Sequence, residues 1–195
     1  MRVQVVIQWG TYYQSPDLNA ESRRDAMVLG LSLPAFTLVH VVISLIGIVA
    51  GLIVMFGLLG SKPMPGLTAI FLLFTILTNA TGFLFPFKEL LPSYIIAAIS
   101  LVLLAIACVA LYGMKLSGAW RPVYIVTAMI ALYFNVFVLI IQSFLKVPAL
   151  AALAPAVPPA PPSGPVFAVV QGIVLVFFVL LTIGAWRRYK PLAFA

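Results

Sequence analysis

Residues 35–59 read AFTLVHVVISLIGIVAGLIVMFGLL, an apolar run without a single Asp, Glu, Lys or Arg. A transmembrane α-helix needs about 20 mostly apolar residues in succession, so this run is long enough to cross a bilayer. Pro34 precedes the run and Lys62 follows it. An extended strand would leave its backbone groups without hydrogen-bond partners in lipid. The run therefore predicts a membrane-spanning helix.

Four further segments have the same character, and prolines or charged residues close each of them. They cover residues 67–85, 93–114, 122–145 and 166–186. None carries an Asp, Glu, Lys or Arg in its interior. The sequence therefore predicts an all-α fold, a polytopic integral membrane bundle of about five transmembrane helices within residues 34–190.

The composition of the whole chain points to the same class. Of its 195 residues, 64% are hydrophobic and 8% are charged, and the mean hydropathy is +1.22. A soluble domain is about 45–50% apolar and about 25% charged, so that class is excluded. The net charge of +7 comes mostly from Lys and Arg at the ends of the segments. That distribution favours contact with anionic lipid headgroups. We expect the lipid bilayer as a partner, and no nucleic acid.

The remaining parts of the chain are polar or rich in proline. Residues 1–33 form a polar tail, in which Ser15 and the proline after it resemble the start of an interfacial helix. Met27 is an alternative start, so the natural protein is expected either to include the residues before it or to begin there. Seven prolines in residues 148–165 predict an extended loop, and residues 191–195 form a short tail.

Basic residues at the segment ends predict the orientation. With five spans, six basic residues lie on the carboxy-terminal side of the membrane, and four lie near the membrane on the other side. Cytoplasmic flanks carry an excess of Lys and Arg. We therefore expect the amino terminus outside and the carboxy terminus inside. The six are Lys62, Lys115, Arg121, Arg187, Arg188 and Lys190, and the four are Arg23, Arg24, Lys88 and Lys146.

Small and polar residues at helical spacing predict where the helices meet, because close backbone approach drives association in lipid. Ser44, Gly47 and Gly51 share one face of the first segment. Gly82 ends a similar face of the second segment. We expect these four residues to serve helix packing.

Six polar side chains inside the spans form the candidate ligand-binding site. With alternating helix directions, five of them fall in the half of the bilayer on the amino-terminal side, and one lies near the middle. Polar groups in a membrane are costly, which makes them functional candidates. The alternative is that they only form hydrogen bonds between helices. The six are His40, Asn79, Tyr94, Asn135, Gln142 and Gln171.

The chain offers little else for chemistry. His40 is the one histidine, whereas a membrane haem normally takes two axial ligands and a metal site needs several donors. Cys108 has no second cysteine to pair with. No protease, hydrolase or nucleotide-binding motif is present. We expect no catalytic residue, no metal ligands and no cofactor.

Three stretches carry a resemblance to known sequences. They are HVVISLIG at residues 40–47, TGFLFPF at residues 81–87, and the run from NVFV to FLKVPA within residues 135–149. They resemble those of a family of uncharacterised small multi-pass bacterial inner-membrane proteins without an established function. The resemblance covers roughly residues 36–190. It implies an inner-membrane location and brings no activity.

Two functions follow as hypotheses. Since nearly every residue serves spanning or packing, the first is a non-enzymatic accessory or assembly subunit of a larger membrane complex, joined to other membrane subunits or to copies of itself. The alternative is a module that binds a small quinone-like lipophile or conducts protons. In that case the polar cluster around His40 is the site.

Overall fold

The computed structural model describes residues 27–85, 92–154 and 161–190. The chain divides into two units, Met1–His40 and Val41–Ala195, and each is described here by itself. The predicted interfacial helix after Ser15 lies outside the described residues.

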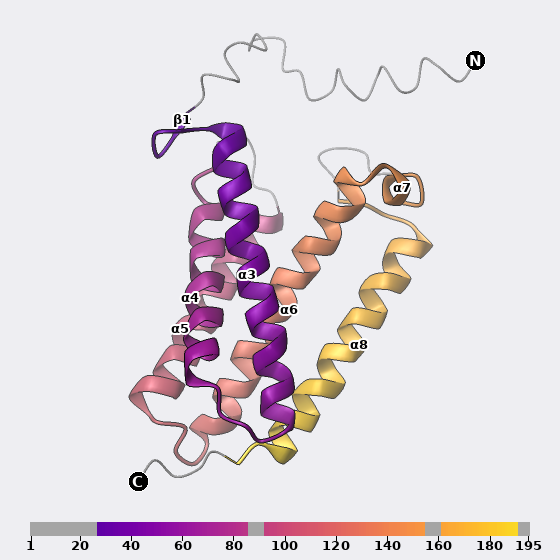
Figure 1. The fold of residues 1–195 in the computed structure, drawn as a ribbon. Helices are drawn as coiled ribbons and strands as arrows, with labels where there is room; N and C mark the ends of the chain where they lie inside the picture. Colours follow the sequence, from indigo (N-terminus) through magenta and orange to yellow (C-terminus); the bar gives the residue numbers. More distant parts are fainter. Residues whose placement is uncertain (1–26, 86–91, 155–160, 191–195) are drawn as a thin grey trace, which may run out of the picture. The chain divides into compact units, whose positions relative to one another are not determined.

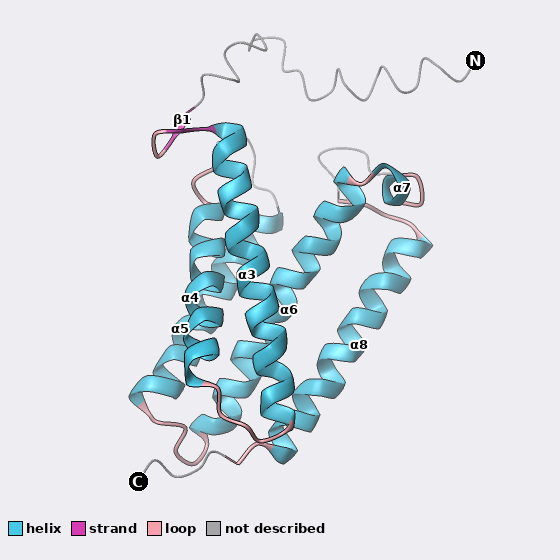
Figure 2. Ribbon diagram, in the orientation of Figure 1, coloured by secondary structure: helices cyan, strands magenta, loops and turns pink. Residues whose placement is uncertain are grey.

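Among the described residues, five helices are long and apolar enough to cross a membrane, which confirms the predicted all-α bundle (Figures 1 and 2). The third membrane helix consists of α5 and the π-helical turn η1 that follows it. The five are α3 (Leu33–Leu59), α4 (Pro65–Gly82), α5 (Pro92–Cys108) with η1 (Val109–Gly113), α6 (Trp120–Lys146) and α8 (Pro165–Arg188).

A short hairpin in the amino-terminal unit was not expected from the sequence. Strand β1 (Met27–Val28) pairs antiparallel with β2 (Leu31–Ser32). Leu29 and Gly30 form the turn, with φ angles of 54° and 79°. Two consecutive residues with positive φ are typical of the tightest hairpin turns. Helix α3 begins directly after β2 and crosses the boundary between the two units.

Three local features differ from the sequence expectation. Helix α4 ends at Gly82, three residues before the predicted end. Helix α6 begins at Trp120, so Pro122 takes the third helical position, where a missing N–H costs nothing because it has no intrahelical partner. The proline-rich stretch opens with one helical turn, α7 (Pro148–Ala151), started by Pro148 at its first position. Residues 155–160 of that stretch lie outside the described residues.

Helices α6 and α8 pack antiparallel along their full length (Figure 1). The rings of Tyr133 and Phe178 lie 5.7 Å apart between centroids, and those of Phe144 and Phe167 lie 5.4 Å apart. The two contacts are eleven residues apart on α6 and eleven residues apart on α8. The two helices therefore stay in the same alignment between these contacts.

The core of the larger unit lies where α6 faces α3, α4 and α5. Gly51 of α3 allows the closest approach, because a Cβ there would lie 2.6 Å from Leu132 Cδ1 and 2.8 Å from Phe71 Cδ2. One turn earlier, a Cβ on Gly47 would lie 3.3 Å from the backbone and the hydroxyl of Thr75. The predicted packing face of α3 therefore meets α4 and α6 at its two glycines.

Candidate functional site

Asn79 is the first of the predicted polar residues that the structure buries. It lies one turn from the carboxy-terminal end of α4 and is 6% exposed. Its Nδ2 donates a 2.7 Å hydrogen bond to the carbonyl oxygen of Thr75 on the same helix. Through this donor, the side chain therefore forms a hydrogen bond within its own helix and does not link two helices.

Asn135 and Gln171 are also buried, on α6 and α8. Gln171 Nε2 donates to the carbonyl oxygen of Phe137 at 3.2 Å, which ties α8 to α6. Its Oε1, and Nδ2 of Asn135, have no hydrogen-bond partner within the described part of the chain. Buried polar atoms usually have partners, so these two atoms need an explanation.

Two hydroxyls outside the predicted site share this property. Thr75 on α4 and Ser100 on α5 are fully buried, and the hydroxyl oxygen of each lacks a partner among the described residues. By contrast, Thr78, Thr127 and Thr182 each donate to the carbonyl oxygen four residues earlier, at 2.7–2.8 Å. Helical spacing places both on packing faces, Thr75 with Asn79 and Ser100 with Ala107, but it does not indicate that their hydroxyls lack partners.

Tyr94 and Gln142 lie away from this buried group. The Tyr94 ring is half-buried near the start of α5 and packs on Phe83 at 5.8 Å between centroids. Gln142 is exposed, although it shares a face of α6 with the buried Asn135. The structure thus does not bring Gln142 into contact with the buried polar atoms.

His40 belongs to the amino-terminal unit, where it is half-buried on α3. Its predicted meeting with the polar residues of the larger unit stays a prediction. Ser44 and Gly82, which were assigned to packing, are each half-buried.

A second polar region lies where α6 begins and α8 ends. There Ser61 Oγ accepts a 2.9 Å hydrogen bond from the backbone N–H of Lys190. The Arg121 guanidinium donates to the carbonyl oxygen of Tyr189 at 2.9 Å. Ser61 lies two residues after the end of α3, with a φ of 53° and its N–H bonded to Leu58 O. These bonds join the α3–α4 turn, the start of α6 and the end of α8.

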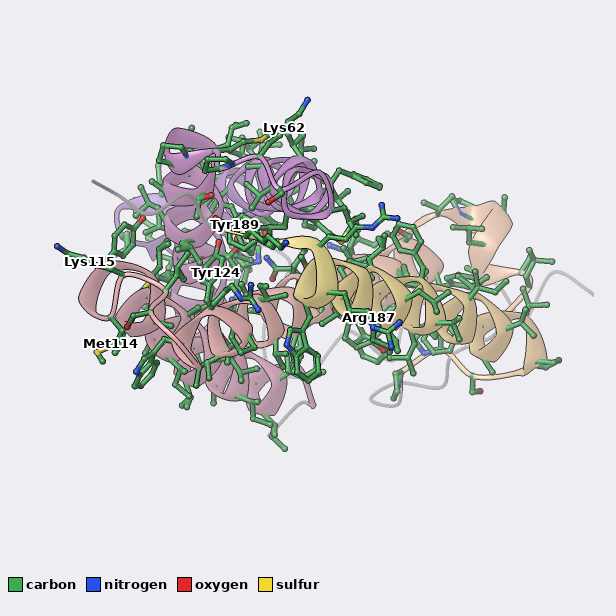
Figure 3. The ribbon with its side chains drawn as sticks, turned by 90° about the horizontal axis from the view of Figure 1, so that it is seen from below. Lys62, Met114, Lys115, Tyr124, Arg187 and Tyr189 are labelled. Carbon is green, nitrogen blue, oxygen red and sulfur yellow. The ribbon has the colours of Figure 1, made fainter. Side chains whose placement is uncertain are left out.

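Tyrosines fill the centre of this end of the larger unit. Seen along the helices, Tyr124 and Tyr189 lie near one another, while Lys62 and Lys115 point outward (Figure 3). Tyr124 is 2% exposed and lies beside Thr68 of α4. Burial raises the pKa of the Tyr189 phenol above its ordinary value, so the group stays neutral. Helical spacing places Tyr124 on the small and polar face of its segment together with Ala128 and Asn135, whereas nothing in the sequence singles out Tyr189.

Charge is distributed unevenly over the described residues. The four acidic residues of the chain, Asp17, Glu21, Asp25 and Glu89, fall in residues 1–26 and 86–91, outside them. Residues 27–85, 92–154 and 161–190 contain no group of three or more His, Cys, Asp or Glu side chains that could hold a metal ion. The described residues therefore include basic side chains but no carboxylate side chain.

In comparisons with models of protein families, with curated proteins and with solved structures, no match to the chain was found. The resemblance to small bacterial inner-membrane proteins therefore stays a prediction, and the function is argued from the geometry alone.

Proposed function

We propose that the chain is a non-enzymatic accessory or assembly subunit of a larger complex in the bacterial inner membrane, and that α8 holds it to a helix of another subunit. In the most apolar stretch of α8 only 11% of the residues are buried, against 44% in α6. Exposure alone fits contact with lipid, since lipid tails cover any apolar face. A more specific feature is needed to indicate a protein partner.

That feature is a pair of small residues on the open face of α8. Ala168 and Gly172 are both exposed and lie one helical turn apart. A Cβ on Gly172 would meet nothing within 4 Å. Small residues one turn apart let two helices approach closely in a membrane, where apolar area alone drives no association. This pair is the observation that supports a docking helix.

The proposed orientation places the end of α8 in the cytoplasm. The hydrogen bonds at Ser61 and Arg121 bring the α3–α4 turn and the start of α6 to the end of α8. Lys62, Arg187 and Arg188 belong to these same segments. Lys146 ends α6 at the opposite end. The excess of cations at one end supports a cytoplasmic location for it.

Gly172→Leu is expected to leave the protein folded and to remove its partner. The added side chain meets open space within the chain but blocks close approach of a second helix. The measurement is purification from native membranes in mild detergent, with the mass of the intact complex determined. Ala105→Leu, the same kind of change on the exposed face of α5, is the matched control. A partner retained at full stoichiometry by Gly172→Leu would refute the docking role of α8.

A second candidate function is binding of a small quinone-like lipophile, or passage of protons. It is favoured by the buried polar atoms without partners, among them Asn135 Nδ2 and Gln171 Oε1. Organic extraction of the purified protein, followed by mass spectrometry, tests the binding. A lipophile present in a fixed ratio to protein would support it, and a lipid mixture in no fixed ratio would count against it.

A further inference from the structure

The geometry points to a binding site for a small uncharged oxygen group in the centre of the larger unit, among α3, α4, α5 and α6. Its ligands are the hydroxyls of Thr75 and Ser100 and the amide Nδ2 of Asn135. Water has this chemistry, and so does the carbonyl head of a membrane lipophile. The inference does not depend on the role of α8 as a docking helix. It narrows the second candidate function by assigning the site to Thr75 rather than to the surroundings of His40.

The first step is that α4 and α5 bring two hydroxyls to a similar depth. The contact between the rings of Phe83 and Tyr94 marks a common level for the two antiparallel helices. At about 1.5 Å of rise per residue, Thr75 lies roughly 12 Å along α4 from that level and Ser100 roughly 9 Å along α5. The two hydroxyls therefore differ in depth by only about 3 Å.

The second step is that helix α6 brings a third polar group, Asn135, to a similar depth. Tyr124 of α6 lies beside Thr68 of α4, which marks a common level for these two helices; they run in the same direction. Asn135 and Asn79 each lie eleven residues beyond that level, so they share a depth. Thr75 is one turn below Asn79. The polar groups of three helices thus form one layer about 6 Å thick.

The third step is that Thr75 directs its hydroxyl away from its own helix. A threonine in a membrane helix can donate to the carbonyl four residues earlier, as Thr78 does to Phe74. Thr75 Oγ1 instead lies 3.3 Å from the position of a Cβ on Gly47 of α3. It therefore points toward α3 within the larger unit, and it has no hydrogen-bond partner among the described residues.

The chemistry of the layer selects the guest. Each hydroxyl both donates and accepts, and the Asn135 amide nitrogen donates. No charged side chain belongs to the part of the larger unit that forms this layer, so an ion would lack compensation there. A neutral oxygen accepts from the amide and exchanges hydrogen bonds with the hydroxyls. Buried waters typically make about three such bonds to groups that would otherwise lack partners.

Thr75→Val tests the site by the sign of its effect on thermal stability. Valine has the shape of threonine, so the substitution removes a polar group without changing the packing. If the hydroxyl holds a guest, the midpoint of unfolding falls by several degrees, whereas an unpartnered hydroxyl predicts a rise. We expect the fall. Thr78→Val is the matched control, because its hydroxyl serves only its own helix, and its midpoint is expected to change by about a degree.

Two further measurements complete the test. Ser100→Ala repeats the sign test at a second ligand, so the site stays testable if Thr75→Val does not fold. Organic extraction then identifies the source of the guest. A lipophile that is stoichiometric in the wild type and lost in Ser100→Ala indicates a lipophile head, and a fall in stability without one indicates water. A rise in the unfolding midpoint of both variants would overturn the inference.

Discussion

Gly51→Leu is expected to remove most of the folded protein. A single Cβ at this position would already lie 2.6 Å from Leu132 Cδ1 and 2.9 Å from Phe71 Cε2. Leucine adds three more carbon atoms to a site where α3, α4 and α6 meet. Overpacking a tight core costs about 1–3 kcal/mol and occasionally more. Because both neighbours are themselves buried in the core, we expect the upper end of that range, measured as thermal stability in mild detergent.

The matched control for this prediction is Gly172→Leu, the same substitution on a different helix. A Cβ on Gly172 meets nothing within 4 Å, so the stability of the isolated chain should stay within about 0.5 kcal/mol of the wild type. If Gly51→Leu and Gly172→Leu had equal stability, α3 would not pack on α4 and α6 through its glycine face.

Tyr124→Ala is expected to produce the second large loss of stability. The Tyr124 side chain is 2% exposed and belongs to the core together with Ile125 and Ala128. Removing a buried aromatic ring leaves a cavity and costs about 3–5 kcal/mol. The lost polar contact with Thr68 adds to this loss. Thermal unfolding of the purified variant measures the sum.

Two companion variants separate the contributions at Tyr124. Tyr124→Phe keeps the ring and removes the hydroxyl, so it should cost about 1 kcal/mol. Tyr112→Ala removes a tyrosine that is 58% exposed, and it should leave stability nearly unchanged. A loss for Tyr112→Ala as large as that for Tyr124→Ala would contradict the packing described for α6.

The number and type of the helices could be predicted from the sequence, because a chain in lipid must pair its backbone groups within each span. A charge-free run such as residues 35–59 has no alternative to a helix in lipid. Helix ends were less predictable. Phe83 is as apolar as the span before it, yet α4 ends at Gly82. Apolar residues indicate which part of the chain can lie in lipid. The end of a helix depends instead on local backbone hydrogen bonds, here the bond from the Phe83 N–H to Ala80 O.

The candidate site could be predicted only in part. Spacing along α4 and α6 indicates that Asn79 and Asn135 face other helices, and both are buried. The same spacing places Gln142 on the face of Asn135, but Gln142 is exposed. Helical periodicity indicates which face of a helix a residue lies on. It does not indicate how far the neighbouring helices extend along that face. Whether the hydroxyl of Thr75 bonds to its own helix depends on a side-chain torsion angle, which sequence spacing does not determine.

The crossing of the membrane by these helices is tested most directly by the accessibility of single cysteines. Cys108 is replaced by alanine, and Ser61, Ser117 and Ser163 are each changed to cysteine in turn. Whole cells are then treated with a membrane-impermeant maleimide, before and after permeabilisation. Cysteines at positions 61 and 117 should react only after permeabilisation, and the cysteine at 163 should react in intact cells. If positions 61 and 117 differ, or if all three positions behave alike, the helices do not cross the membrane in the way described.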